Sequence, residues 1–249
     1  MLRLFATPNT SAIFPAKTCC VISPASYADF RHRKAAGVRY NLLLVVMPAI
    51  GITGGIATGK SSFCECLREV LPAAKFFNAD QAAHDLVELP EVKQEIREKF
   101  GSGIFSLDGD LNREKLRAII FSDATRKRAL ERILHPRIRR QWRTEAKRRR
   151  NSPEFFFADI PLLYETGGET LCDRVVVVAC SYEVQLARLT QRMSLKQVEA
   201  EQMIKSQMPL EEKIAEADHV VWNDGSRAVL MEQARFLVAL WQRQTWTKK

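Results

Sequence analysis

The sequence predicts an α/β protein in which one five-stranded parallel β-sheet lies between two layers of helices. Five short apolar runs recur along the 249 residues, spans with helical periodicity separate them, and a glycine-rich segment follows the first run. Continuous apolar strands that alternate with helices are typical of a parallel sheet covered on both faces. The five runs are 49–53, 75–78, 155–160, 175–179 and 219–222.

The glycine-rich segment Gly54–Ser61 fits the pattern Gly-x-x-x-x-Gly-Lys-Ser of a phosphate-binding loop, or P-loop. It comes directly before residues 62–71, whose apolar side chains recur at helical spacing. In a strand, loop and helix arranged this way, backbone N–H groups and the helix dipole face phosphate oxygens. The sequence therefore predicts a P-loop NTPase-type three-layer α/β/α fold that binds a nucleoside triphosphate.

Each part of this loop has an expected task. Lys60 is expected to reach the β- and γ-phosphates, and the Ser61 hydroxyl to ligate Mg²⁺. The backbone N–H groups are expected to hold the other phosphate oxygens. The expected nucleotide-binding residues of the loop are Gly54, Gly55, Ile56, Ala57, Thr58, Gly59, Lys60, Ser61 and Ser62.

From Met47 onward the sequence predicts one domain with two helical additions. The core is expected over 47–80, 153–182 and 217–245. A helical insertion, 81–152, is too long for a simple crossover, and a second helical stretch, 183–216, separates the last two strands. Helices are expected over 81–88, 91–100, 112–121, 123–150 and 226–244.

Residues 1–46 differ in composition from the rest, because they hold six Lys or Arg against one acidic residue. One interpretation is an organelle transit peptide. The other, which we favour, is a disordered extension outside the working protein, with translation starting at Met47. Met47 runs straight into the first predicted strand, as a natural start would.

The net charge of +9 suits an anionic substrate and a nucleic acid equally well, so it does not choose between them. No apolar stretch reaches the roughly 18 residues that a membrane-spanning helix needs. The charge therefore restricts the function less than the motifs do.

Two aspartates follow predicted strands, where ligands of parallel sheets are bound. Asp80 is expected to follow a strand beside the P-loop strand, so that its carboxylate faces the γ-phosphate and takes a proton from an acceptor hydroxyl. The alternative is a helix N-cap. Asp159 ends the third strand, the position of a Mg²⁺-water ligand in many P-loop enzymes, and the alternative is a cap or turn residue.

Basic residues gather at two places. His135–Arg140 is interpreted as a helix start with Pro136 in the first turn, where Arg137 would bind an acceptor phosphate; the alternative is a solvated basic helix. Arg188 and Arg192 would fold over the triphosphate and stabilise charge in the transition state, unless they form surface salt bridges. With Gln185 they share one helix face.

An ordered series of motifs extends from Ala49 to about Leu240. It comprises Ile52–Ile56, Asn78-Ala79-Asp80 with His84, Leu134–Pro136 with Ile138, Ile160–Leu163 with Glu165, Cys172–Val175, Gln185–Leu189 with Arg192, Ser206-Gln207 with Lys213, Ala217-Asp218, and Asn223 with Gly225. Through this series the sequence resembles the dephospho-coenzyme A kinase family. Only the P-loop is specific by itself; the order of the whole set is what unrelated P-loop kinases do not share.

The resemblance implies transfer of the γ-phosphoryl group of ATP to the ribose 3′-hydroxyl of dephospho-coenzyme A, the last step of coenzyme A synthesis. It implies that 81–152 binds coenzyme A, that 183–216 is a lid, that Asp80 is the catalytic carboxylate and that Asn223 lies near the adenine. We expect a cytoplasmic, Mg²⁺-dependent monomer or weak oligomer that binds neither nucleic acid nor membrane. The implied acceptor-binding residues are His84, His135, Arg137, Pro161, Leu162, Leu163 and Glu165.

Two positions depart from the family pattern. Asn78 stands where an aspartate is usual, which leaves Asp80 as the only carboxylate of that pair. Ala57 stands where glycine is usual, and a positive φ there would strain the alanine by about 1 kcal/mol. Three other interpretations stay open on the residues alone. They are another small-molecule kinase, such as a nucleoside monophosphate kinase, a nucleotide-gated RNA-binding protein that uses the basic helix, and a member of the fold without catalysis, which only Asn78 and Ala57 support.

Overall fold

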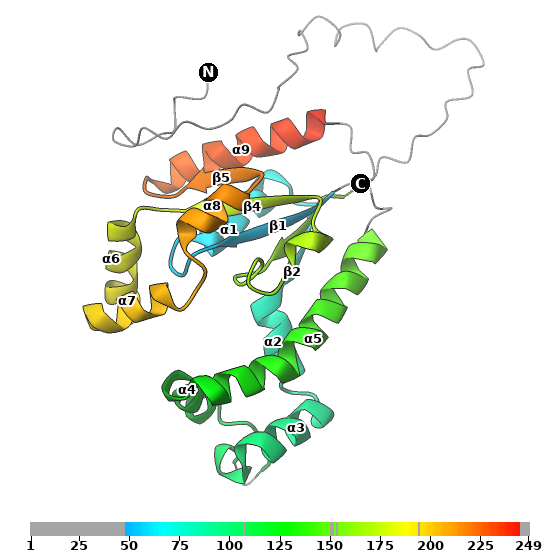
Figure 1. The fold of residues 1–249 in the computed structure, drawn as a ribbon. Helices are drawn as coiled ribbons and strands as arrows, with labels where there is room; N and C mark the ends of the chain where they lie inside the picture. Colours follow the sequence, from blue (N-terminus) through cyan, green and yellow to red (C-terminus); the bar gives the residue numbers. More distant parts are fainter. Residues whose placement is uncertain (1–47, 107, 150–151, 153, 194, 245–249) are drawn as a thin grey trace, which may run out of the picture. The chain divides into compact units, whose positions relative to one another are not determined.

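The computed structural model describes residues 48–106, 108–149, 152, 154–193 and 195–244, all within the compact unit Leu44–Lys249 (Figure 1). The expected extension, 1–46, lies outside the described residues. The predicted five-stranded parallel sheet is confirmed, and each strand falls on its predicted run. The strands are β1 (Ala49–Gly54), β2 (Lys75–Asn78), β3 (Phe156–Asp159), β4 (Arg174–Ala179) and β5 (His219–Trp222).

We expected β2, the strand before Asp80, to lie beside the P-loop strand β1, and this prediction was wrong. The strand order is β2-β3-β1-β4-β5, so β3 pairs with β1, and β2 lies at the sheet edge. A central strand is covered on both faces, and all four residues of β3 are buried, with Asp159 as the last of them. In β2, by contrast, Lys75 is exposed and the other three residues are half-buried. The long insertion between β2 and β3 lets the chain return to the inner position.

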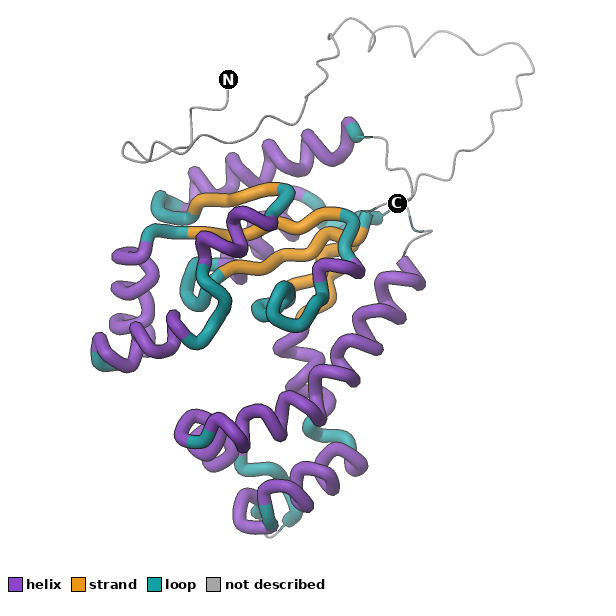
Figure 2. The backbone as a smooth tube through the Cα atoms, in the orientation of Figure 1, coloured by secondary structure: helices purple, strands orange, loops and turns teal. Residues whose placement is uncertain are grey.

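Alternate strand residues pack into opposite helical layers, as the two-residue period of a strand requires. One face of the sheet packs against α1 (Lys60–Val70) and α9 (Arg227–Arg243), whose Trp241 is fully buried. The other face packs against α8 (Leu210–Glu216) and the carboxyl-terminal half of α5 (Ala124–Arg149). Figure 2 shows the strands between these helices. The result is the predicted three-layer arrangement.

The insertion between β2 and β3 has a hydrophobic cluster of its own. It consists of α2 (Ala79–Leu86), α3 (Pro90–Phe100), the 3₁₀ turn Ser102–Ile104, α4 (Arg113–Ser122) and the amino-terminal half of α5. These elements bury residues such as Val92, Ile96 and Ile133 against one another. In Figure 1 these helices form a separate part of the molecule, below the sheet. The insertion can therefore form a wall of a site without rearranging the sheet.

The interpretation of Pro136 as the start of a helix was wrong. Pro136 lies inside the 26-residue helix α5, where it has no N–H to donate to the carbonyl four residues earlier. A proline at such a position bends a helix, and α5 changes direction along its length (Figures 1 and 2). The half before Pro136 packs in the cluster of the insertion, and Trp142 in the other half packs on the sheet.

The helical stretch between β4 and β5 consists of α6 (Tyr182–Met193), α7 (Gln197–Lys205) and α8. A 3₁₀ turn, Glu169–Leu171, lies between β3 and β4. Within the described ranges, no helix is both long and apolar enough to cross a bilayer.

Candidate active site

The P-loop joins the end of β1 to the start of α1, and close packing explains its glycines. A Cβ on Gly54 would lie 2.4 Å from the Val178 carbonyl oxygen. Gly59 has φ 92°, in the left-handed region, and a Cβ there would lie 1.9 Å from Nδ2 of Asn223. Both contacts are shorter than a real Cβ tolerates, so the glycines let the loop lie against its neighbours.

Replacement of Gly59 by alanine is therefore expected to destabilise the protein and to weaken nucleotide binding. The alanine would be held in the left-handed region, at a cost of about 1 kcal/mol or more, and would displace the Asn223 amide. Thermal unfolding and ATP titration calorimetry measure both effects. Gly103→Ala is the matched control, because a Cβ there meets nothing within 4 Å. Equal melting temperatures for the two variants would contradict the packing argument.

Ala57 has φ 59°, and it is the one non-glycine residue with a positive φ in the part of the chain that the structure describes. The sequence left open whether this position needs a left-handed backbone; it does. Alanine in that region is strained by about 1 kcal/mol, because its Cβ approaches the following carbonyl oxygen. The surrounding contacts must hold the loop in this shape.

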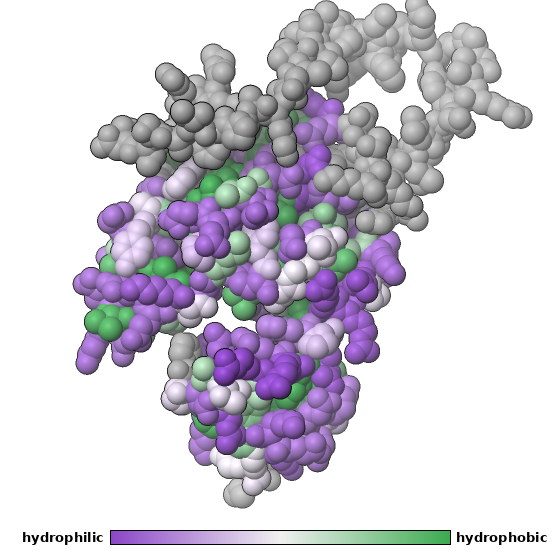
Figure 3. All heavy atoms as spheres, in the orientation of Figure 1, coloured by the Kyte–Doolittle hydropathy of each residue, from purple (hydrophilic) through white to green (hydrophobic). Residues whose placement is uncertain are grey.

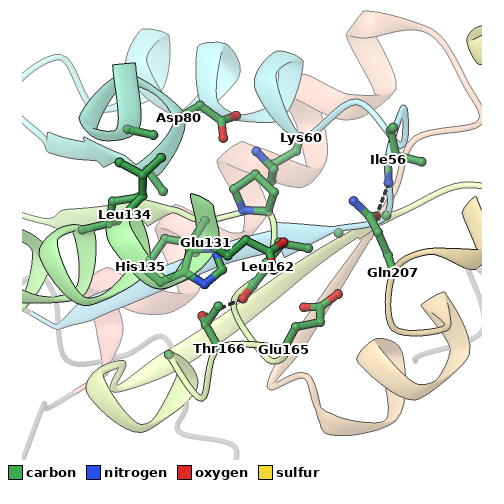
Figure 4. A pocket seen from close by; sticks show the side chains of 18 of the residues that line it. Ile56, Lys60, Asp80, Glu131, Leu134, His135, Leu162, Glu165, Thr166 and Gln207 are labelled. Carbon is green, nitrogen blue, oxygen red and sulfur yellow. Dashed lines mark hydrogen bonds between the residues drawn. The ribbon is translucent and has the colours of Figure 1, made fainter. Parts of the chain in front are cut away.

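A cavity of about 1330 Å³ opens between the P-loop and the helical insertion (Figure 3). Small-ligand pockets are usually about 300–1,000 Å³, so this one has room for a long or a second ligand. Figure 4 shows Lys60 and Asp80 pointing into it from one side and Leu162 and Glu165 lying on another. Of the P-loop residues expected to bind nucleotide, those that line it are Gly54, Gly55, Ile56, Ala57, Gly59, Lys60, Ser61 and Ser62.

Lys60 forms an ion pair with Asp159, and both side chains are nearly buried. The second Asp159 oxygen accepts a hydrogen bond of 3.0 Å from Nδ2 of Asn78, whose Oδ1 accepts one of 2.8 Å from the Gln81 N–H and caps α2. An aspartate at position 78 could cap the helix, but it could not donate to Asp159. The hydrogen bond that the Asn78 amide donates to Asp159 therefore explains why asparagine is suited to this position.

Asp80 lies in the first turn of α2 and lines the cavity beside Lys60. The N-cap alternative was wrong, because Asn78 caps this helix. Loss of water around the carboxyl group raises the pKa of Asp80. Lys60 opposes this shift and Asp159 adds to it, so the carboxylate interacts electrostatically with both. A carboxyl group with a raised pKa that lines a cavity is suited to accept a proton.

The loop after β3 lies beside the P-loop and forms another wall of the cavity. Pro161, Leu162 and Glu165 line the cavity together with His135 of α5. Glu165 is fixed by the fully buried Lys213 of α8, whose Nζ lies 2.8 Å from Oε1. The structure therefore brings four of the predicted acceptor residues into the same space as Lys60 and Asp80.

The other predicted acceptor residues do not line the cavity. His84 is exposed on α2 with its Nδ1 3.9 Å from Asp85. Arg137 forms an ion pair with Glu95 of α3 and donates to the Ile133 carbonyl at 2.7 Å. Leu163 is fully buried beneath the wall, in the core.

Two residues expected at the nucleotide, Asn223 and Arg188, donate hydrogen bonds to the P-loop backbone at Thr58. Thr58 is fully buried, and its carbonyl accepts from Nδ2 of Asn223 at 2.8 Å. Arg188 donates to the carbonyls of Thr58 at 3.2 Å and Asn223 at 2.6 Å, so it is bonded to backbone rather than paired with a surface acid. For Arg192 the structure describes the backbone in α6 but not the side chain.

Several of the residues that line the cavity were not predicted from the sequence. Gln207, which follows α7, lines the cavity and contacts the P-loop. Besides the predicted His135, α5 lines the cavity over most of its length, mainly at the spacing of successive helical turns, with Ala124, Lys127, Arg128, Leu130, Glu131, Leu134, Pro136, Ile138, Arg139 and Trp142. The helical spacing of these residues can be read from the sequence, but the sequence does not show that this face of the helix lies across from the P-loop.

The sequence matches a known family over most of its length. The dephospho-CoA kinase family model matches residues 48–228. A dephospho-CoA kinase of Symbiobacterium thermophilum is 43% identical over 183 residues, which are 72% of this chain and 75% of that protein. The corresponding protein of Carboxydothermus hydrogenoformans is 36% identical over 208 residues, which are 83% of this chain and all of that protein.

Solved structures show the same likeness. A Thermus thermophilus protein superposes with a TM-score of 0.66 at 32% identity, over 78% of this chain and 97% of its own. Dephospho-CoA kinase from Campylobacter jejuni superposes with a TM-score of 0.57 at 27% identity, over 78% of this chain and 96% of its own. Both likenesses therefore extend over more than three quarters of this chain and nearly the whole of the other protein.

Proposed function

The chain belongs to the dephospho-CoA kinase family, and from this premise we propose how its residues divide the work of the reaction. The reaction moves the γ-phosphoryl group of ATP to the ribose 3′-hydroxyl of dephospho-CoA and yields coenzyme A and ADP. The single observation that supports the assignment of roles is that Lys60, Asp80 and the loop after β3 face one cavity.

On the donor side, the P-loop N–H groups and Lys60 hold the β- and γ-phosphates. Transfer of a phosphoryl group depends mainly on positioning and on neutralising negative charge, so a fixed ammonium group at the γ-phosphate favours the transition state. The ion pair with Asp159 orients Lys60 before the nucleotide binds. Arg188, which touches the P-loop carbonyls, adds positive potential from behind.

On the acceptor side, Asp80 accepts the proton of the 3′-hydroxyl as its oxygen attacks the γ-phosphorus. One P–O bond forms, the bond between the γ-phosphorus and the β,γ-bridging oxygen breaks, and ADP leaves with that electron pair. The proton resides on the Asp80 carboxyl group until water removes it. The chemistry needs the ionised form of Asp80 at the start of each turnover.

The residues present fit a Mg²⁺ ion that arrives with ATP. Mg²⁺ is bound in such sites by one or two protein oxygens, substrate phosphates and water, and Ser61 and Asp159 offer a hydroxyl and a carboxylate. Among the described residues there is no cluster of three or more His, Cys, Asp or Glu that could form an all-protein metal site. When bound, the ion would neutralise the charge that develops on the phosphates.

The helical insertion, 81–152, is proposed to seat the acceptor, and 183–216 to act as the lid. His135, Pro161, Leu162 and Glu165 are the cavity residues best placed for the acceptor. We further propose a cytoplasmic enzyme, monomeric or weakly associated, that acts without a nucleic acid or membrane partner.

The decisive experiment measures ADP release with ATP, Mg²⁺ and dephospho-CoA, side by side with AMP and CMP as acceptors. Turnover with dephospho-CoA alone, with one phosphate appearing at the 3′-position per ADP, is expected. Preferential phosphorylation of AMP or CMP would replace the proposal by a nucleoside monophosphate kinase. Salt-sensitive RNA binding without phosphoryl transfer would indicate the RNA-binding alternative.

The raised pKa of Asp80 leads to a prediction about pH. Because the base acts in its ionised form, kcat/KM for dephospho-CoA is expected to fall as the pH drops through a pKa above the ordinary value of about 4. The residual activity of Asp80→Asn should lack this acid limb, whereas the titration of ATP itself affects both proteins equally. An identical limb in the variant would contradict the assignment of the base.

A further inference from the structure

The P-loop is held at Ile56 by a glutamine from each end of the helical segment 182–209. The Ile56 N–H donates to Oε1 of Gln207 at 2.9 Å, and the Ile56 carbonyl accepts from Nε2 of Gln185 at 2.7 Å. Gln207 follows α7 and Gln185 lies in α6, so both polar groups of one P-loop residue are bonded to the proposed lid. Figure 4 shows Gln207 reaching the loop.

Neither glutamine contact is a loose surface contact. Gln185 is 3% exposed, and a Cβ on Gly55 would lie 2.8 Å from its Nε2, so the glycine leaves the space that this amide occupies. Gln207 is kept in place through its neighbour, because the Met208 N–H donates to Oε1 of Glu165 at 3.0 Å.

Glu165 is in turn tied to the start of the P-loop. Its partner Lys213 has its Nζ 3.4 Å from the Gly54 carbonyl and 3.2 Å from the Pro161 carbonyl. The contacts thus close a ring that runs from Gly54 through Lys213, Glu165 and Gln207 back to Ile56.

This clamp lies directly beside the strained residue. Ile56 precedes Ala57, whose φ of 59° is unfavourable for an alanine, and the next residue, Thr58, is bonded by Arg188 and Asn223. A strained conformation persists only where its neighbours fix it. Fixing both sides of Ala57 prevents the loop from relaxing into a right-handed or extended conformation.

We infer that Gln207 and Gln185 are positioning residues that hold the P-loop in its binding shape against the strain of Ala57. The inference rests on the proposed function in one respect, namely that this loop binds ATP. It assigns the proposed lid a task besides covering the substrate: its two ends preorganise the phosphate site through Ile56.

The test is a double-mutant cycle on ATP affinity, measured by titration calorimetry with Mg²⁺. Gln207→Leu removes the acceptor of the Ile56 N–H, so the loop relaxes in the free protein. Part of the binding free energy of ATP is then used to restore the left-handed conformation of Ala57. The Kd for ATP is expected to rise about fivefold, which corresponds to about 1 kcal/mol. In the Ala57→Gly background the same substitution is expected to raise Kd less than about twofold, because glycine adopts the conformation without strain.

Gln202→Leu is the matched control, since Gln202 is exposed on the preceding helix α7. It should leave Kd unchanged in both backgrounds, and melting temperatures show that every variant is folded. Equal changes from Gln207→Leu in both backgrounds, or no change at all, would overturn the inference. A chain that binds ATP with the expected coupling but does not phosphorylate dephospho-CoA would contradict the proposed function alone.

Discussion

Replacement of Asp80 by asparagine is expected to lower kcat by more than about a hundredfold, the usual contribution of a positioned general base. Asparagine has nearly the same shape but cannot accept the proton of the 3′-hydroxyl. The KM values for ATP and dephospho-CoA should change little, because the other groups that line the cavity stay in place. Steady-state kinetics with both substrates varied separate the two quantities.

The same variant should not lose stability. The pKa of Asp80 is raised in the folded protein, so folding binds the proton more tightly, and above that pKa the ionised carboxylate costs stability that the neutral amide does not. Asp85→Asn, on the exposed side of the same helix, is the control and should keep normal turnover. Near-normal turnover of Asp80→Asn would show that Asp80 is not the general base.

Replacement of Lys60 by methionine is expected to lower turnover by more than about a hundredfold, because the γ-phosphate loses its fixed positive charge in the transition state. The variant should also be less stable, since Asp159 is 3% exposed and would lose its charged partner while keeping the Asn78 hydrogen bond. Leaving one partner of a buried ion pair costs up to about 3–5 kcal/mol. Single-turnover kinetics and chemical denaturation measure the two effects.

Lys60→Arg separates catalysis from stability. An arginine keeps a positive charge beside Asp159, so the free energy of unfolding should stay close to that of the native chain. Its planar guanidinium group cannot place the charge at the same point on the phosphate, and turnover should still fall by at least about tenfold. Full activity of Lys60→Arg or Lys60→Met would show that this lysine serves the fold only.

The elements of the fold could be predicted because each depends on local sequence. The P-loop is written in consecutive residues, and the buried strands, such as Val175–Ala179, are uninterrupted apolar runs. The strand order is a matter of which runs pair, and consecutive strands are neighbours only about two-thirds of the time. Exposed Lys75 in β2 was the available sign of an edge strand.

The side-chain contacts of the site could be predicted only where a motif contained them. Gln207 and Ile56 are 151 positions apart, and no periodicity relates them. Arg137 looked like an anion ligand because of its charge, but Glu95 on another helix pairs with it. Asn78 stood out as a missing carboxylate, yet the hydrogen bond that it donates to Asp159 needs the amide. The contacts of Gln207, Arg137 and Asn78 all depend on partners that are far away in the sequence.

Helix α5 belongs to two hydrophobic clusters, with Pro136 between its two halves. Ile138, two residues after the proline, packs against both clusters, so the bend joins the insertion to the sheet. Because α5 lines the cavity on both sides of Pro136, an acceptor bound along the helix would contact residues that belong to both clusters.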